Sequence, residues 1–136
     1  MRDVLATIKA IENKDRVHKV VFDMCDTTIS MFSLELPSYI QVGSCVKLSA
    51  HPTAIAIAKN LLDTTQISYE NQLQATILSI DKGELLSVLQ LDICGYEIES
   101  VISTTALECM GLNPDDKVVA LIKASQLAIS EVCDDR

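Results

Sequence analysis

Side chains that could do chemistry are few in this sequence and are scattered along it. The chain has five cysteines, two histidines and four glycines among its 136 residues. Nucleophilic catalysis needs a local arrangement that activates a cysteine or serine, and no such signature is present. The glycines do not form a phosphate-binding loop. We therefore expect a protein without enzymatic activity.

The cysteines are the first candidates for a metal or redox site. They are Cys25, Cys45, Cys94, Cys109 and Cys133. No pair has the close spacing with which two ligands of a zinc motif reach one ion. Their odd number and wide spacing are typical of ordinary reduced thiols in a reducing compartment. A metal site or a disulfide framework is the alternative.

Two polar positions at the ends of predicted strands carry the remaining candidate groups. Lys123 is followed two residues later by Ser125, and His51 is followed in the same way by Thr53. A neutral histidine can donate one hydrogen bond, and it gains charge beside an anion. On position alone, each of these cations is either a solvated side chain or a ligand group.

The elements that must position these residues are short β-strands. β-Branched and apolar residues dominate ten segments that are separated by turn residues. The predicted strands are residues 4–12, 17–25, 28–34, 44–50 and 53–59 in the first half, and 72–81, 84–94, 97–103, 117–123 and 126–132 in the second. A short helix is predicted over Thr104–Met110, with Gly111 at its end. Five strands with a helical turn between the third and fourth predict a mainly β fold with a small OB-like barrel in each half.

The two halves repeat each other in sequence. Residues 6–12 (ATIKAIE) return as 75–81 (ATILSID), and 23–25 (DMC) return as 92–94 (DIC), each 69 residues further along. A period of this length, present only twice, indicates a duplicated small domain and not a solenoid.

This duplication predicts a domain organisation. We expect a divergent first barrel over residues 1–60, a connector over 61–71 and a second barrel over 72–136. A unit of about 65 residues buries only about 60% of its unfolded surface and is marginally stable alone. Each barrel is therefore expected to pack on its twin or on another copy, which predicts a homo-oligomer.

Composition excludes several classes of partner. The formal net charge is −8, whereas a nucleic-acid binder needs clustered Lys and Arg. No apolar stretch approaches the length of a membrane span, and the N-terminus does not resemble a signal peptide. We expect a cytoplasmic protein that binds neither membranes nor, by this chain alone, nucleic acid.

Several segments in the second half follow one family pattern. They are 68–73 (SYENQL), 75–80 (ATILSI), 101–106 (VISTTA), 112–118 (LNPDDKV) and 120–125 (ALIKAS). Together they resemble the Mop domain, the molybdate- and tungstate-binding type within the TOBE group, over about residues 68–132. The first half resembles this family only through its likeness to the second. The whole chain is therefore similar to a tandem Mop protein.

The resemblance implies a function and a set of ligand residues. It implies molybdate or tungstate, bound as an oxyanion at interfaces between barrels, and trimers for tandem chains. The donors to such a tetrahedral dianion would be hydroxyls, backbone N–H groups and a cation. By match to the ligand-contacting segments of the family, the implied oxyanion-binding residues are Ser68, Tyr69, Ser103, Lys123, Ala124 and Ser125, with His51 and Thr53 in the first half.

One position departs from the family. Glu70 stands where the family has an arginine, and a carboxylate repels a dianion. Glu70 points away, pairs with Lys123 when the site is empty, or marks a weak or lost site. Ser103 also has a simpler interpretation as a helix cap.

The sequence thus predicts reversible molybdate or tungstate binding for storage, homeostasis or sensing. The alternative is a degenerate Mop pair that serves as an interaction or assembly module and no longer binds oxyanion. Glu70 and the altered segment around His51 favour this alternative, whereas Lys123 and Ser103 favour binding.

Overall fold

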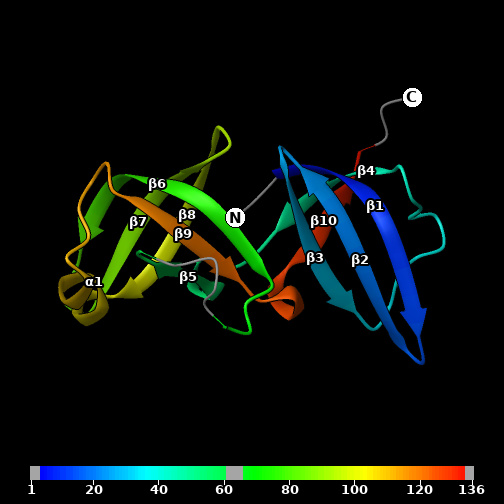
Figure 1. Ribbon diagram of the computed structural model, residues 1–136, viewed down its shortest axis with the longest axis horizontal. Coiled ribbons are helices and arrows are strands. Elements are labelled where there is room, and N and C mark those ends of the chain that lie inside the picture. The colour runs from blue at the N-terminus through cyan, green and yellow to red at the C-terminus, as the bar shows by residue number, and fades with distance from the viewer. Residues whose placement is uncertain (1–3, 61–65, 134–136) are drawn as a thin grey trace.

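The computed structural model describes residues 4–60 and 66–133 (Figure 1). Residues 61–65 of the expected connector lie outside the described part. In chain order the elements are β1 (Val4–Lys14), β2 (Val17–Met24), β3 (Thr27–Ser33), β4 (Cys45–Ser49), the 3-10 turn η1 (Pro52–Ala54), β5 (Ile55–Ala58), β6 (Asn71–Lys82), β7 (Leu86–Ile93), β8 (Tyr96–Ser103), α1 (Thr104–Met110), β9 (Lys117–Ile122), the 3-10 turn η2 (Ala124–Gln126) and β10 (Ala128–Val132).

The strands form where apolar residues alternate with exposed ones. Val4, Ala6 and Ile8 of β1 are buried and the residues between them are exposed, as expected for a strand with one face on a core. In β6, Leu73, Ala75 and Ile77 repeat this pattern. The inward faces of the strands make up the hydrophobic core.

Two antiparallel five-stranded sheets curl into OB-like barrels, which confirms the mainly β fold class. Their strand orders are β10-β4-β1-β2-β3 and β5-β9-β6-β7-β8. Each first strand carries a bulge at the same place, between Ile8 and Ala10 in β1 and between Ile77 and Ser79 in β6. A bulge bends a strand and increases its twist, which helps a short sheet to curl.

The barrels do not follow the expected division of the chain. The last strand of each half is exchanged: β5 pairs with β9, with Ile55 opposite Ile122, and β10 pairs with β4, with Ile129 opposite Leu48. Figure 1 shows both crossings between the barrels. The boundaries 1–60, 61–71 and 72–136 remain a prediction for the units of the sequence repeat. They do not delimit the two barrels, because each barrel takes one edge strand from the other half of the chain. The apolar pattern predicts that β5 and β10 are strands without specifying which sheet they join.

The helix of the second half is confirmed at its predicted residues. The Ser103 hydroxyl accepts a hydrogen bond from the Ala106 N–H at 3.1 Å, which caps the first turn. Gly111 ends the helix with φ 62°, a left-handed conformation that glycine adopts readily. In the first half the corresponding segment, residues 34–44, is a loop of turns without a helix.

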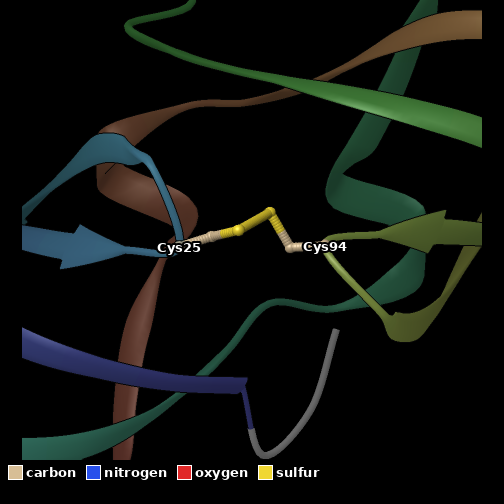
Figure 2. The surroundings of a disulfide bond; sticks show 2 residues. All are labelled: Cys25 and Cys94. Carbon is tan, nitrogen blue, oxygen red and sulfur yellow. A yellow bond between two sulfur atoms is a disulfide. The ribbon is translucent and has the colours of Figure 1, made fainter.

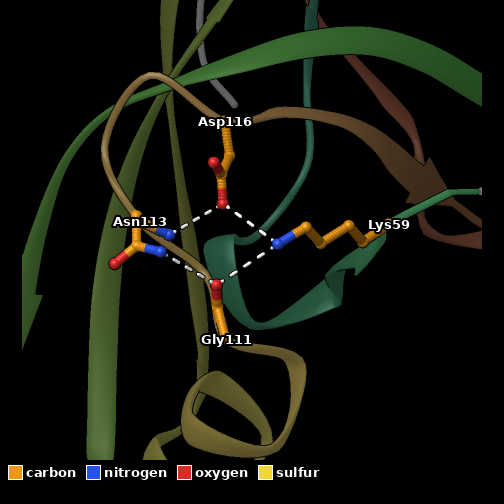
Figure 3. A network of polar contacts seen from close by, with 4 residues as sticks. All are labelled: Lys59, Gly111, Asn113 and Asp116. Atoms are coloured by element: carbon orange, nitrogen blue, oxygen red, sulfur yellow. Dashed lines mark hydrogen bonds and ion pairs between the residues drawn. The ribbon is translucent and has the colours of Figure 1, made fainter.

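The exchanged strand β5 is held at its end by a polar network on the second barrel (Figure 3). The Lys59 ammonium lies 3.3 Å from the Asp116 carboxylate and donates to the Gly111 carbonyl at 3.2 Å. The Asn113 backbone N–H donates to the same carboxylate at 2.9 Å, and its side chain donates to the Gly111 carbonyl at 3.1 Å. A first-half lysine thus closes a second-half turn.

Two further polar contacts cross between the halves of the chain. The Asn71 side chain, of which 1% is exposed, accepts from the Ser30 N–H at 2.7 Å and donates to the Ser30 carbonyl at 2.9 Å. The Ser100 hydroxyl donates to the Ile55 carbonyl at 2.7 Å. These bonds satisfy buried backbone groups that the sheets leave unpaired.

The cysteines differ from the expectation of ordinary thiols. Cys25 and Cys94 form a disulfide with their Cα atoms 6.4 Å apart (Figure 2). They are equivalent residues of the two repeats, 69 positions apart. The spacing of the two cysteines along the chain did not predict this contact, because only the packing of the two barrels brings the equivalent turns together. Cys109 is a free, exposed thiol.

None of the helices in the described part of the chain has the length and apolar character that crossing a lipid bilayer requires.

Candidate functional site

A pocket of about 350 Å³ lies where η1, η2 and the segment before β6 come together. Its lining comes from both halves of the chain: Thr53, Ala54, Ala56, Tyr69, Lys123 and Gln126. Three predicted site residues, Thr53, Tyr69 and Lys123, are therefore brought together. The lining contains one cation and several neutral polar groups, and no carboxylate.

Lys123 provides the positive charge of this pocket. It stands immediately before η2 in an extended conformation, and its side chain is exposed and makes no capping hydrogen bond. Its carbonyl accepts from the Gln126 N–H at 2.9 Å, which fixes the turn. Within residues 4–60 and 66–133, the ammonium has no ion-pair partner. Its charge is thus open to a ligand.

His51 occupies the matching place before η1 but is used differently. Its Nδ1 accepts from the Thr53 N–H at 3.3 Å and lies 2.8 Å from the Thr53 hydroxyl oxygen, so it caps η1. His51 lines a separate pocket that also contains Glu97 and Glu99. Carboxylates beside it disfavour a dianion there. The two matching positions are therefore electrostatically unlike.

Glu70 is paired on the first barrel. Its carboxylate lies 2.9 Å from the Lys19 ammonium, and it does not line the Lys123 pocket. The hydrogen bond from Lys19 to Glu70, together with the charge of Glu70, raises the pKa of Lys19 above its ordinary value. The lysine also lies 5.7 Å from the centre of the Phe32 ring. Of the three alternatives for Glu70, the structure supports the first. The side chain is directed away from the pocket and is held by Lys19.

The other predicted site residues are not gathered in this pocket. Ser103 caps α1, which Figure 1 places at the outer end of the second barrel. Ser125 lines a groove between β3 and β10 whose walls are partly apolar and partly polar, and Ala124 is buried. Ser68 is exposed, and it lines neither the Lys123 pocket, nor the His51 pocket, nor the groove between β3 and β10.

Sequence reasoning missed two residues that shape the site. Gln126 contributes an amide group to the pocket, although it was predicted as the start of a strand. Asn71 holds the segment that carries Tyr69 against the first barrel. The only sequence signal for Asn71 was its place directly after Glu70 in a family-like segment, which says nothing of a contact with β3.

Comparison with known proteins places the second half of the chain in a family. Residues 67–129 match the TOBE domain. A solved molybdate-binding protein from Sporomusa ovata is 37% identical over 44% of this chain and 90% of its own, with a TM-score of 0.43. Residues 67–129 are a TOBE domain. No curated protein sequence matches it.

The tandem Mop arrangement extends over both halves. The cytoplasmic molybdate-binding protein ModG, solved with molybdate bound, matches 93% of this chain and 92% of its own, with a TM-score of 0.84 and 21% identity. At that identity the likeness establishes the shared fold. Both halves of this tandem Mop protein, including the divergent first half, therefore share the double-barrel fold of ModG.

Proposed function

We propose that this tandem Mop protein binds molybdate or tungstate reversibly. The observation that carries the proposal is the pocket between η1 and η2, whose lining combines the Lys123 ammonium with neutral donors and no carboxylate. ModG, which shares the fold, was solved with molybdate bound. The proposed role is binding, without a chemical step.

The chemistry of the pocket suits a tetrahedral dianion. Lys123 supplies charge, while the Thr53 hydroxyl and the Gln126 amide supply neutral hydrogen bonds. Sulfate has the same charge as molybdate, so the proposed selectivity comes from the size of the cavity and not from charge. Tyr69 is part of the lining of this cavity.

The Glu70 carboxylate does not argue against this proposal. Its ion pair with Lys19 removes much of its repulsion at the pocket, because the two charges are 2.9 Å apart. In the family pattern an arginine at this position would add attraction instead. We therefore propose binding with a smaller electrostatic contribution than the family pattern implies.

Assembly is part of the proposal. The resemblance implies trimers, with oxyanions held between barrels of different copies. Ser68, Ser103 and Ser125 are exposed and are available to such interfaces. We propose that they, with the backbone at Ala124, complete sites that one chain leaves open. In the cytoplasm such an assembly would serve molybdate storage, homeostasis or sensing.

The alternative function is an interaction module without oxyanion binding. A groove of about 610 Å³ between β3 and β10 favours it, because the exposed apolar side chains of Phe32, Leu34 and Tyr39 line it. Such a groove is a common feature of protein-binding surfaces. Binding measurements decide between the two functions.

The test is calorimetric titration of the full chain with molybdate, comparing Lys123→Ala with Lys82→Ala as the matched control. Lys82 pairs with Glu108 away from the pocket. Loss of a charged hydrogen bond at Lys123 should weaken binding about tenfold or more, and the control should bind like the unchanged protein. Equal effects of the two substitutions would reject the pocket as the site.

A further inference from the structure

The Cys25–Cys94 disulfide joins equivalent turns of the two barrels. Cys25 is the first residue of the two-residue turn between β2 and β3, and Cys94 is the first residue of the turn between β7 and β8. Both adopt left-handed backbone conformations, with φ 58° and 53°, as such tight hairpins require. Both residues are exposed. The bridge is therefore open to attack by a dissolved thiol.

The barrels do not depend on this bridge to stay together. Exchange of β5 and β10 already interlocks them, and Asn71 and Ser100 make buried hydrogen bonds across the two halves. A covalent link is thus redundant for association. Its specific effect is to fix the spacing of the two hairpin turns.

Those turns lead into the strands that support the pocket. β3 packs on η2, and β8 packs on η1. The Ser100 hydroxyl of β8 is bonded to the Ile55 carbonyl, at the end of η1. η1 supplies Thr53 to the pocket wall, and Lys123 on the same wall stands immediately before η2. Figure 2 shows the bridge spanning the gap between the two hairpins.

We propose that Cys25 and Cys94 form a reversible thiol–disulfide switch that restrains η1 and η2 and thereby sets the oxyanion affinity of the pocket. The effect on affinity rests on the proposed function, whereas the restraint of the two turns does not. In a reducing compartment, disulfides are usually transient or redox-sensing and not structural. An exposed bridge between hairpins that are already interlocked fits that use.

The oxidant is a low-molecular-weight disulfide such as glutathione disulfide. One protein thiolate attacks a sulfur of glutathione disulfide, releasing one glutathione and leaving a mixed disulfide. The second protein thiolate then displaces the other glutathione and forms the Cys25–Cys94 bond. The two protein thiols lose two protons and two electrons, and one glutathione disulfide becomes two glutathione molecules.

The oxidised form should bind oxyanion more tightly, because donors held in place lose less freedom on binding. Couplings of this kind typically change affinity by about fivefold or more. By reciprocity, molybdate should make the bridge harder to reduce by the same factor.

The experiment equilibrates the full chain in glutathione redox buffers, with and without molybdate. The bridge is read by alkylation and intact mass, and the η1 and η2 amides are read by hydrogen exchange. Cys25→Ser/Cys94→Ser is the variant, and Cys109→Ser, which removes an exposed thiol outside the bridge, is the matched control.

We expect one two-electron transition in the native protein, faster exchange at η1 and η2 after reduction, and at least about fivefold weaker molybdate binding. The double variant should behave like the reduced protein in every buffer, and the control should behave like the unchanged chain.

Two results would overturn the proposal. One is a disulfide that glutathione reduces only after the protein unfolds, and the other is equal hydrogen exchange at η1 and η2 in both redox states. Equal molybdate affinity in the two states would overturn the link to binding. If neither state binds molybdate, the proposed function fails, and the exchange data still decide whether the bridge restrains the turns.

Discussion

Asn71 joins the two barrels through a pair of buried hydrogen bonds. Its amide pairs with both the N–H and the carbonyl of Ser30, in a place that solvent does not reach. It also lies two residues after Tyr69 and beside Glu70, so it positions the segment that reaches the pocket. One side chain therefore couples the fold to the candidate site.

Asn71→Ala should destabilise the protein strongly. Both Ser30 backbone groups would be left buried without partners, and each costs about 1–3 kcal/mol. We expect the free energy of unfolding, measured in denaturant, to fall by about 2–4 kcal/mol. Gln74→Ala, at an exposed position of β6, is the control and should change it by less than about 0.5 kcal/mol. A small effect of Asn71→Ala would show that water or another group satisfies Ser30.

The lowered pKa of Asp116 should make the free energy of unfolding depend on pH in the acid range. Hydrogen bonding from the Asn113 backbone N–H, and also the Lys59 ammonium, holds the pKa of Asp116 below its ordinary value of 3.8. A lowered pKa in the folded state stabilises the protein above the unfolded pKa, and this contribution is lost as pH falls through the folded value.

Asp116→Asn should remove that contribution. The free energies of unfolding of the unchanged protein and the variant should differ at about pH 6 and converge towards about pH 3. Denaturant titrations at both values measure the difference. A gap between the two proteins that stays constant with pH would contradict the lowered pKa.

At the scale of elements, the exchange of β5 and β10 is the feature that organises the molecule. β5 leaves the first half and completes the second barrel beside β9, and β10 returns to complete the first beside β4. The pocket lies at this crossing, because η1 precedes β5 and η2 precedes β10. The exchange therefore positions the two turns that line the candidate site.

Ile55→Ala should show this exchange directly. Ile55 is buried in β5 opposite Ile122 of β9. Truncation of a buried isoleucine costs about 2–5 kcal/mol, and here the loss belongs to the second barrel. Hydrogen exchange should accelerate in β9 more than in β4. Greater acceleration in β4 would mean that β5 closes its own half.

The sequence was sufficient to predict where the strands and the helix lie, but not which strands pair with one another. Alternation of apolar residues predicted the strands, and Ser103 and Gly111 delimit the helix that the sequence predicted at Thr104–Met110. The same apolar pattern fits β5 to either barrel, so the exchange was missed. The Cys25–Cys94 bridge was missed because it depends on packing between repeats and not on spacing along the chain.

The candidate site was predicted in part. Thr53, Tyr69 and Lys123 converge from segments far apart in the chain. His51 was grouped with Lys123 because the repeat aligns them, but repeat alignment carries no information on neighbours such as Glu97. The pairing of Glu70 with Lys19 likewise required the barrels to be in place.

At the scale of the whole molecule, two interlocked barrels place a cationic pocket in an acidic protein. The net charge is −8, which opposes anion approach at long range, although salt screens this effect beyond roughly 8 Å. In the proposed function, the local charge at Lys123 holds the oxyanion against this repulsion. Assembly into trimers would bring further donors to the same surfaces.

Native mass spectrometry of the intact protein, with molybdate, tungstate and sulfate offered separately, tests the central claim most directly. We predict a trimer that gains discrete masses of molybdate or tungstate, with none for sulfate. The number of added masses per trimer counts the sites. An assembly that takes up none of the three anions would contradict oxyanion binding and would favour the interaction module.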